Sequence, residues 1–245
     1  MDYEQAVDAA PPGWRHYEPR DLHRLPMGAK TRELARIPPG ELRRFEEGDS
    51  GAQERVLKAA FWSLVYHLDP EKWDALAGVE PIDGRILDQL PSTPGLAVDV
   101  GAGSGRLTAH LLRRCGRVLA VEPARGLASL LKRRHSSASV VAGWAEALPL
   151  PDCASQLTSA CGSLGPDPAV LAELSRVTAI GGTIALISPE SPEWFESEGW
   201  RRVSVEPTAA PQHDRWIDEF FGLPDPPHEL VMTTVHQRPL ARSRR

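Results

Sequence analysis

The chain has 245 residues, a formal net charge of -5 at pH 7 and a sequence pI of about 5.9. A weakly acidic surface does not attract phosphate backbones over long range, so nucleic acid is a disfavoured partner. No apolar run approaches the roughly 20 residues that a membrane-spanning helix needs. The three cysteines (Cys115, Cys153 and Cys161) have neither the even count of a disulfide framework nor CxxC spacing. We therefore expect a soluble, cytoplasmic protein without a structural metal or a membrane partner, and the oligomeric state stays open.

Changes in composition along the chain predict three segments. Residues 1–50 are rich in Pro, Arg and Glu and lack periodicity, so we expect an irregular arm. Residues 51–84 are expected to form a small helical lid. Residues 85–245 are expected to form the main domain, which is long enough to bury a single core.

Two start signals predict a pair of helices in the lid. Ser50 and Gln53 have the spacing of a capping box, and apolar residues then recur at helical intervals as far as Leu68. The run Asp69-Pro70-Glu71 supplies an N-cap residue, a proline for the first helical position and an acid for the first turn. The second helix is expected to end near Gly78.

Beyond residue 85, short apolar runs alternate with helical segments, which predicts βαβ units and a parallel sheet with right-handed crossovers. The apolar runs are Leu96–Val100, Val118–Val121, Ser139–Ala142, Gln156–Ala160 and Thr183–Ile187. The helical segments are Arg106–Arg114, Gly126–Arg134 and Ala169–Ala179. Gly181-Gly182 is expected to cap the last of these helices. A helix at Pro192–Gly199 and strands at Arg201–Val205 and Glu229–His236 are expected to complete the domain.

The strongest functional signal is the glycine-rich turn that follows the first apolar run. Gly101, Gly103 and Gly105 permit a tight turn and let a ligand approach bare backbone. Their GxGxG spacing, followed by Arg106, departs from the GxGxxG fingerprint of dinucleotide-binding proteins. Asp99 ends the strand two residues before the first glycine, where a carboxylate needs a polar partner. We expect Asp99 to face a ligand or the waters around one.

The second signal is Glu122, which lies 17 residues after Gly105 at the end of the next apolar run. In a doubly wound sheet, an acid at this place can accept two hydrogen bonds from a ribose diol. The plain alternative is a solvated acid at a strand end. With the glycine loop upstream, we favour the ribose interpretation.

Together these motifs resemble the class I S-adenosylmethionine-dependent methyltransferases, especially the type-11-like group that acts on small molecules. The resemblance covers about residues 85–190. Residues 143–152 (GWAEALPLPD) resemble the family's segment after the third strand, and residues 174–182 (LSRVTAIGG) resemble the segment before the fifth. The resemblance implies an α/β fold, a Rossmann-like three-layer sandwich whose seven-stranded sheet is mostly parallel, with an antiparallel last strand.

The resemblance also implies S-adenosylmethionine as cofactor, with S-adenosylhomocysteine as product, lying across the carboxyl ends of strands one to four. The methionine part would lie on Asp99 and the Gly101–Gly105 loop, the ribose on Glu122, and the adenine beside Ala145. The residues expected to contact the cofactor are Asp99, Gly101, Ala102, Gly103, Gly105, Glu122, Pro123, Trp144, Ala145, Glu146 and Cys161.

We assign no catalytic residue from the sequence. His67 and His213 are candidate bases, but an ordinary surface or core-edge histidine is the favoured interpretation of each. His110, inside the helix after the glycine loop, is expected to be structural. We expect most of the seven tryptophans to pack in cores or interfaces. The candidates for an apolar substrate pocket are Trp62, Trp144 and Trp216.

The leading functional hypothesis is methyl transfer to a small-molecule acceptor. An RNA or protein methyltransferase is a second hypothesis, disfavoured because no D/N-P-P-Y/F motif follows the fourth strand. The third is a non-methylating cofactor-binding protein on the same fold. It is kept open by Trp144 in place of an acid, by Gln156 in place of an aspartate, and by the lack of a histidine after Cys161. A dehydrogenase is disfavoured by the glycine spacing and by Asp99.

Overall fold

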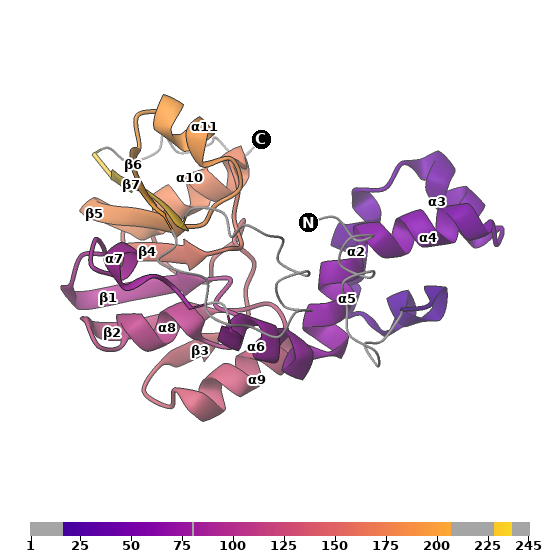
Figure 1. The fold of residues 1–245 in the computed structure, drawn as a ribbon, viewed down its shortest axis with the longest axis horizontal. Coiled ribbons are helices and arrows are strands. Elements are labelled where there is room, and N and C mark those ends of the chain that lie inside the picture. Colours follow the sequence, from indigo (N-terminus) through magenta and orange to yellow (C-terminus); the bar gives the residue numbers. More distant parts are fainter. Residues whose placement is uncertain (1–16, 80, 207–227, 237–245) are drawn as a thin grey trace. The chain divides into compact units, whose positions relative to one another are not determined.

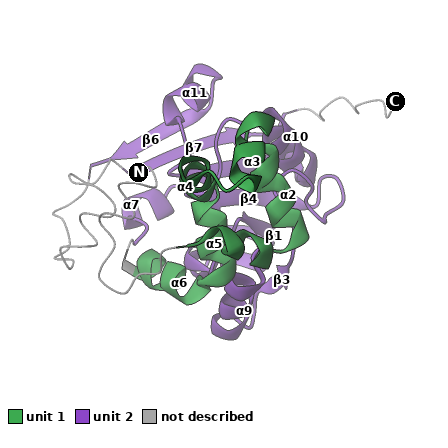
Figure 2. Ribbon diagram, turned by 90° about the vertical axis from the view of Figure 1, so that its right-hand side faces the viewer, with its two compact units in different colours: residues 1–79, 209–226 green, residues 80–208, 227–245 purple. Residues whose placement is uncertain are grey.

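The computed structural model describes residues 17–79, 81–206 and 228–236. The chain divides into two compact units, and Figure 2 colours them separately. The described part of the first unit is residues 17–79, which are helical, and the second unit contains the sheet. The boundary lies near residue 80 rather than residue 84, because Ile82 is buried with Ile86 and Leu87 in a core of the sheet unit.

The helical unit contains more regular structure than we expected. Its elements are a 3-10 helix, η1 (Pro19–Arg24), and the α-helices α2 (Met27–Ala35), α3 (Pro39–Glu46), α4 (Ser50–Ala59), α5 (Phe61–Leu68) and α6 (Pro70–Val79). The expectation of an irregular arm is therefore wrong for residues 17–50; residues 1–16 lie outside the described part. Prolines suggested irregular structure, but Pro19 and Pro39 occupy first turns of helices, where proline is well tolerated.

The helical unit has its own apolar core. Val56, Leu64 and Leu76 are fully buried in it. Trp62, Tyr66 and Trp73 pack against this core, and the ring centroids of Tyr66 and Trp73 lie 4.9 Å apart. These aromatic side chains therefore contribute to packing within the unit. That the unit serves as a lid stays a prediction.

Helix α4 starts one residue earlier than the capping-box pattern indicated. The N-cap is Asp49, whose carboxylate accepts a hydrogen bond from the Ala52 N–H at 2.8 Å, and Ser50 is already the first helical residue. The helix also breaks at Ala60, whose φ of -94° and ψ of 2° lie outside the α region, so the expected single helix to Leu68 is two helices. The start of α6 at Pro70 agrees with its predicted signal.

The sheet unit is built on seven strands in the order β3-β2-β1-β4-β5-β7-β6 (Figure 1). The strands are β1 (Thr93–Val100), β2 (Cys115–Val121), β3 (Ser139–Val141), β4 (Ser155–Cys161), β5 (Thr178–Ile187), β6 (Arg201–Val205) and β7 (His228–Thr234). Strands β1 to β5 pair in parallel, and β7 runs antiparallel to both β5 and β6. The predicted seven-stranded, mostly parallel sheet with an antiparallel last strand is confirmed.

Helices cover both faces of the sheet, which gives three layers. The helices of this unit are α7 (Gly84–Leu87), α8 (Arg106–Leu111), α9 (Arg125–Arg134), α10 (Pro168–Val177) and α11 (Pro192–Ser197). Along β1, Val98 and Val100 pack with residues of α10 and α11, whereas Ala97 packs with residues of α7 and α8. Because successive side chains of a strand point to opposite faces, burial on both sides explains the continuous apolar runs of the sequence.

The glycine pair at residues 181–182 lies inside β5 rather than at the end of a helix. Helix α10 ends at Val177, and β5 begins at Thr178. Gly181 has a φ of +80°, and its N–H donates to the Val235 carbonyl at 2.8 Å. A Cβ on Gly182 would lie 2.9 Å from the carbonyl oxygen of Gln156 on β4. The pair therefore permits a left-handed backbone and a close strand approach, so the expected C-cap is wrong.

Across residues 17–79, 81–206 and 228–236, no helix combines the length and the apolar character that spanning a membrane requires.

The position of the α4 cap can be tested with two neighbouring substitutions. Asp49→Ala removes the acceptor for the Ala52 N–H and is expected to lower the urea concentration at which the protein unfolds. Ser50→Ala, one residue along, is expected to change the free energy of unfolding by no more than about 0.5 kcal/mol. A larger loss for Ser50→Ala than for Asp49→Ala would contradict the assignment of the cap.

Candidate functional site

The glycine loop folds back onto the end of β2. Gly101, Gly103 and Gly105 have φ values of +66°, +56° and +103°, a region that residues with a Cβ rarely adopt. The Gly101 N–H donates to the Val121 carbonyl at 2.9 Å, and the Ala102 N–H donates to the same oxygen at 3.2 Å. The expected glycines are therefore those that the turn requires.

Glu122 joins the glycine loop to the turn that follows β2. Its side chain is 5% exposed. One carboxylate oxygen accepts the Gly103 N–H at 2.8 Å, and the other accepts the Ala124 N–H at 2.7 Å. Burial raises the pKa of Glu122, and the two N–H donors act in the opposite direction. The acid is thus part of the loop's hydrogen bonding rather than a solvated strand end.

Asp99 is almost fully buried, at 1% exposure, and is the next-to-last residue of β1, just before the loop. Its Oδ2 accepts the Thr108 hydroxyl at 2.6 Å, while its Oδ1 has no hydrogen-bond partner. Burial raises the pKa of Asp99 to about 7, the Glu122 carboxylate adds to this, and the Thr108 bond and Arg106 oppose it. A buried carboxyl oxygen without a donor is costly, which points to a polar or cationic group that belongs in the site.

The segment after β3 begins next to the end of β2. The Glu122 N–H donates to the Val141 carbonyl at 3.0 Å, and a Cβ on Gly143 would lie 2.8 Å from the Val121 side chain. Trp144 then forms an isolated bridge with Ala147. The expected residues of this segment, Trp144, Ala145 and Glu146, are each partly buried. They follow the same edge of the sheet as the glycine loop and Glu122.

Cys161 ends β4, the strand on the other side of β1. The Arg106 guanidinium lies 3.5 Å from its sulfur, so a side chain from the start of α8 spans from the glycine loop to β4. Pro123 lies between Glu122 and Ala124 in the turn after β2. All eleven residues singled out from the sequence thus lie at the carboxyl ends of β1 to β4, where open α/β sheets bind ligands.

The sequence did not single out Thr108, Ala124 or Arg106 as parts of this site. Thr108 was within the glycine motif, but its bond to Asp99 depends on the way that α8 turns back beside β1. The Ala124 N–H takes part through its backbone, which residue type does not reveal. Arg106 stands where the GxGxxG fingerprint has its third glycine, and this difference is the sequence feature that could have drawn attention to it.

The candidate bases are distributed over separate parts of the chain. His67 is half-buried in the helical unit, where burial lowers its pKa. His110 lies on α8 beside the Arg113 guanidinium, and burial together with the nearby arginines lowers its pKa. His213 and Trp216 lie outside the described residues. Gln156, which stands in place of the family's aspartate, lies at the other end of β4, where its side chain accepts the Leu96 N–H at 2.8 Å.

Comparison with known proteins identifies the part of the chain that holds this site. Residues 97–182 match a family model described as "Methyltransferase domain". A malonyl-[acyl-carrier protein] O-methyltransferase from Serratia marcescens is 32% identical over 143 residues, which cover 55% of this chain and 55% of that protein. The chain therefore spans about half the length of this curated relative.

Two further similarities concern different kinds of acceptor. A protein from Halobacterium salinarum named for ribosomal RNA small subunit methyltransferase A is 40% identical over 81 residues, 29% of each chain. The crystal structure of geranyl diphosphate C-methyltransferase from Streptomyces coelicolor, which contains S-adenosylhomocysteine, superposes with a TM-score of 0.50. It is 15% identical, and the match covers 66% of this chain and 78% of that one, so it supports the fold alone.

The burial of Asp99 makes a prediction about stability and pH. Its pKa rises from 3.8 to about 7 on folding, so the folded state keeps a proton that the unfolded state has lost. The contribution of Asp99 to the free energy of unfolding is therefore fully present below about pH 4 and declines as the pH rises to about 7, by roughly 1.4 kcal/mol per pH unit. Asp99→Asn keeps an acceptor for Thr108 and removes this titration. We expect the variant to match the wild type near pH 4 and to exceed its stability at pH 8, as measured by urea unfolding. A stability difference that does not change with pH would contradict this.

Proposed function

We infer that this chain is a class I S-adenosylmethionine-dependent methyltransferase, on the match of residues 97–182 to a methyltransferase domain and on its similarity to the relative from Serratia marcescens. We infer further that it transfers the methyl group of S-adenosylmethionine to a small-molecule acceptor and releases S-adenosylhomocysteine. The observation that carries the proposal is the arrangement of two buried carboxyl groups, Asp99 and Glu122, around a GxGxG loop at the carboxyl ends of β1 and β2.

The fit of the methionine part rests on charge. The Oδ1 of Asp99 is buried and lacks a donor. A ligand that carries an ammonium and a sulfonium group would stabilise the ionised form of this carboxyl and of its neighbour Glu122. The neighbours of Gly101 and Gly105 are protein side chains, Ser163 beside the first and His135 with Leu131 beside the second. Gly103 is partly exposed, so we place the approach of the ligand to bare backbone there. Cys161 and Arg106 form the β4 side of this region.

The fit of the nucleoside rests on hydrogen-bonding capacity. Each carboxylate oxygen of Glu122 accepts one backbone N–H, and each keeps a second lone pair that can accept a ribose hydroxyl. Pro123 follows in the same turn. The segment Trp144–Glu146 would lie beside the adenine, with the Trp144 ring as an apolar surface. Backbone groups of this segment could contact the adenine, so the proposed placement of the base does not require an acid in place of Trp144.

The chemistry requires little of the protein beyond orientation. When bound, the cofactor supplies a methyl group that its sulfonium has already activated. The chain's own residues would fix the reacting geometry and exclude water, which can account for much of the rate. An oxygen acceptor often needs a general base, whereas sulfur and many nitrogen acceptors do not. We therefore assign no base.

The choice of a small-molecule acceptor is supported by the net charge of -5 and by the relative from Serratia marcescens, whose name specifies malonyl-[acyl-carrier protein] as the acceptor. The relative from Halobacterium salinarum keeps RNA as the second candidate. A cytoplasmic location is part of the proposal, and its support is that Cys115, Cys153 and Cys161 are not joined in disulfides.

Two glycine substitutions test the cofactor site. Gly103→Asp introduces a carboxylate beside Glu122 and is expected to weaken S-adenosylhomocysteine binding by at least about 100-fold. Gly199→Asp is the matched control, since Gly199 also has a positive φ, of +82°, but follows α11 and has open space around it. Binding is measured by calorimetry after both variants are shown to be folded. Wild-type affinity in Gly103→Asp would contradict the placement of the site.

The acceptor class is tested by following a radiolabelled methyl group. We expect label from S-adenosylmethionine to enter a member of a panel of small carboxylic acids, their carrier-protein thioesters, amines and thiols, and Gly103→Asp to abolish the transfer. Label that enters RNA instead, in a reaction that added salt suppresses, would favour the second candidate.

A further inference from the structure

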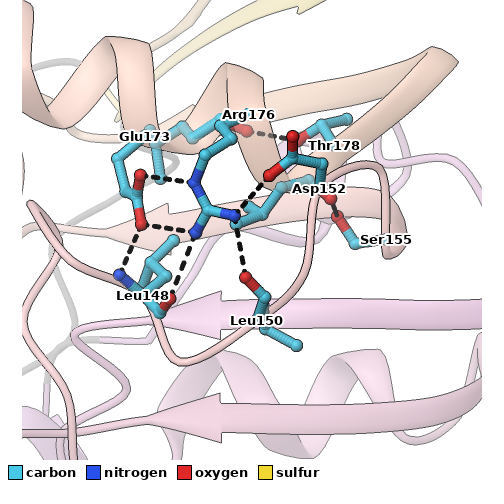
Figure 3. Close-up of polar contacts among 9 residues, drawn as sticks. Leu148, Leu150, Asp152, Ser155, Glu173, Arg176 and Thr178 are labelled. Carbon is cyan, nitrogen blue, oxygen red and sulfur yellow. Dashed lines mark hydrogen bonds and ion pairs between the residues drawn. The ribbon is translucent and has the colours of Figure 1, made fainter. Parts of the chain in front are cut away.

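One arginine binds the second half of the loop that connects β3 to β4. Arg176 lies near the end of α10, and its guanidinium points into the loop of residues 148–153 (Figure 3). This loop directly follows Trp144–Ala147, the segment proposed to lie beside the adenine. The sequence comparison singled out both segments by resemblance, but it gave Arg176 no role.

The guanidinium of Arg176 has five N–H donors, and the structure gives each of them an acceptor. Nε donates to one carboxylate oxygen of Glu173 at 2.7 Å. Nη2 donates to the other Glu173 oxygen at 2.6 Å and to the Leu148 carbonyl at 3.2 Å. Nη1 donates to the Leu150 carbonyl and to Asp152, both at 2.8 Å. A lysine has three donors and no planar geometry, so it cannot reproduce this set.

Two further hydrogen bonds, both donated by backbone N–H groups of the loop, join it to α10. The Leu148 N–H donates to Glu173 at 2.7 Å, so both backbone groups of Leu148 are held by the same pair of side chains. The Cys153 N–H donates to the Arg176 carbonyl at 2.8 Å. Cys153 has a φ of +57°, a strained value for a residue other than glycine, and such strain persists only where the surroundings hold it.

The attachment is charged and persists at neutral pH. The Arg176 guanidinium holds the pKa of Glu173 below its usual range, and Glu173 and Asp152 raise the pKa of Arg176. Glu173 is mostly buried on its side chain, at 14% exposure, whereas Asp152 is 70% exposed. Since an exposed ion pair contributes little, the Arg176–Glu173 pair is the part that matters.

The segment before the loop is therefore fixed at both ends. At one end, β3 pairs with β2 and Gly143 packs on Val121. At the other, the Ala147 N–H closes a turn on the Trp144 carbonyl at 3.1 Å, and the next residue, Leu148, is held by Arg176 and Glu173. Loss of the second attachment would leave Trp144–Glu146 anchored only at β3.

We propose that Arg176, acting through Glu173 and the backbone of Leu148 and Leu150, is a positioning residue that sets the adenine end of the cofactor site and so the selectivity of the site for the base. This rests on the proposed function above. A positioning residue of this kind affects the recognition of the base more than that of the ribose or the methionine part, which lie on β1 and β2.

The test compares Arg176→Lys with Arg202→Lys as a matched control. Arg202 also forms a bidentate pair, with Glu229 at 2.9 and 3.0 Å, but it lies on β6, at the opposite edge of the sheet from β3. Each protein is titrated with S-adenosylhomocysteine and with S-inosylhomocysteine, in which an oxo group replaces the amino group of the base. Hydrogen exchange of residues 148–153 is measured without ligand.

We expect Arg176→Lys to speed exchange at the Leu148 amide and to weaken S-adenosylhomocysteine binding by about tenfold, with most of the preference over the inosyl ligand lost. Arg202→Lys should behave as the wild type does. Unchanged affinity and preference in Arg176→Lys, or an equal loss for both ligands, would overturn the proposal.

Two other outcomes remain decisive. If Arg176→Lys does not fold, Glu173→Gln, which keeps the shape and removes the charge, must give the same loss of preference or the proposal fails. If the wild type binds neither ligand, the proposed function fails. Slower exchange at Leu148 in the wild type than in Arg176→Lys would then show that the attachment exists without serving this cofactor.

Discussion

The site depends on one hydrogen bond, from the Gly103 N–H to the carboxylate of Glu122, which joins the loop after β1 to the end of β2. Three glycines with positive φ bring the loop to that carboxylate, and the Ala124 N–H holds its other oxygen. A polar contact of this kind must be satisfied because Glu122 is buried. The conformation of the loop and the position of the Glu122 carboxylate therefore depend on each other.

The parallel sheet turns this local contact into a site. Strands β1, β2 and β4 end at one edge, which brings Asp99, Glu122 and Cys161 together from distant parts of the sequence. The faces of the sheet are filled by apolar side chains, so the polar partners of these carboxyl groups come from this edge: two backbone N–H groups for Glu122 and the Thr108 hydroxyl for Asp99. Asp99, with one oxygen lacking a donor, carries the clearest cost. The fold thus places a buried carboxyl oxygen without a hydrogen-bond donor at the edge of the sheet where a cationic nucleoside could interact with it.

The sequence predicted the sheet well, because each buried strand appears as a short apolar run and each crossover helix shows its period. It also singled out the glycine loop and Glu122, which a hydrogen bond from the Gly103 N–H joins in the structure, while their role toward a cofactor stays a prediction. It failed where the outcome depends on geometry: Pro19 and Pro39 begin helices rather than interrupt structure, Asp49 caps a helix in place of Ser50, and Gly181 serves a strand. The contacts of Arg176 join residues up to 28 positions apart, and a single sequence gives no sign of such pairing.

The central claim is that the site around Gly103 and Glu122 holds S-adenosylmethionine. It is tested most directly by calorimetric titration of the wild-type protein with S-adenosylmethionine, S-adenosylhomocysteine and NADH in parallel. The account predicts that both adenosyl ligands bind with micromolar dissociation constants, about -8 kcal/mol, and that NADH gives no signal. Binding of NADH, or silence for both adenosyl ligands, would contradict it.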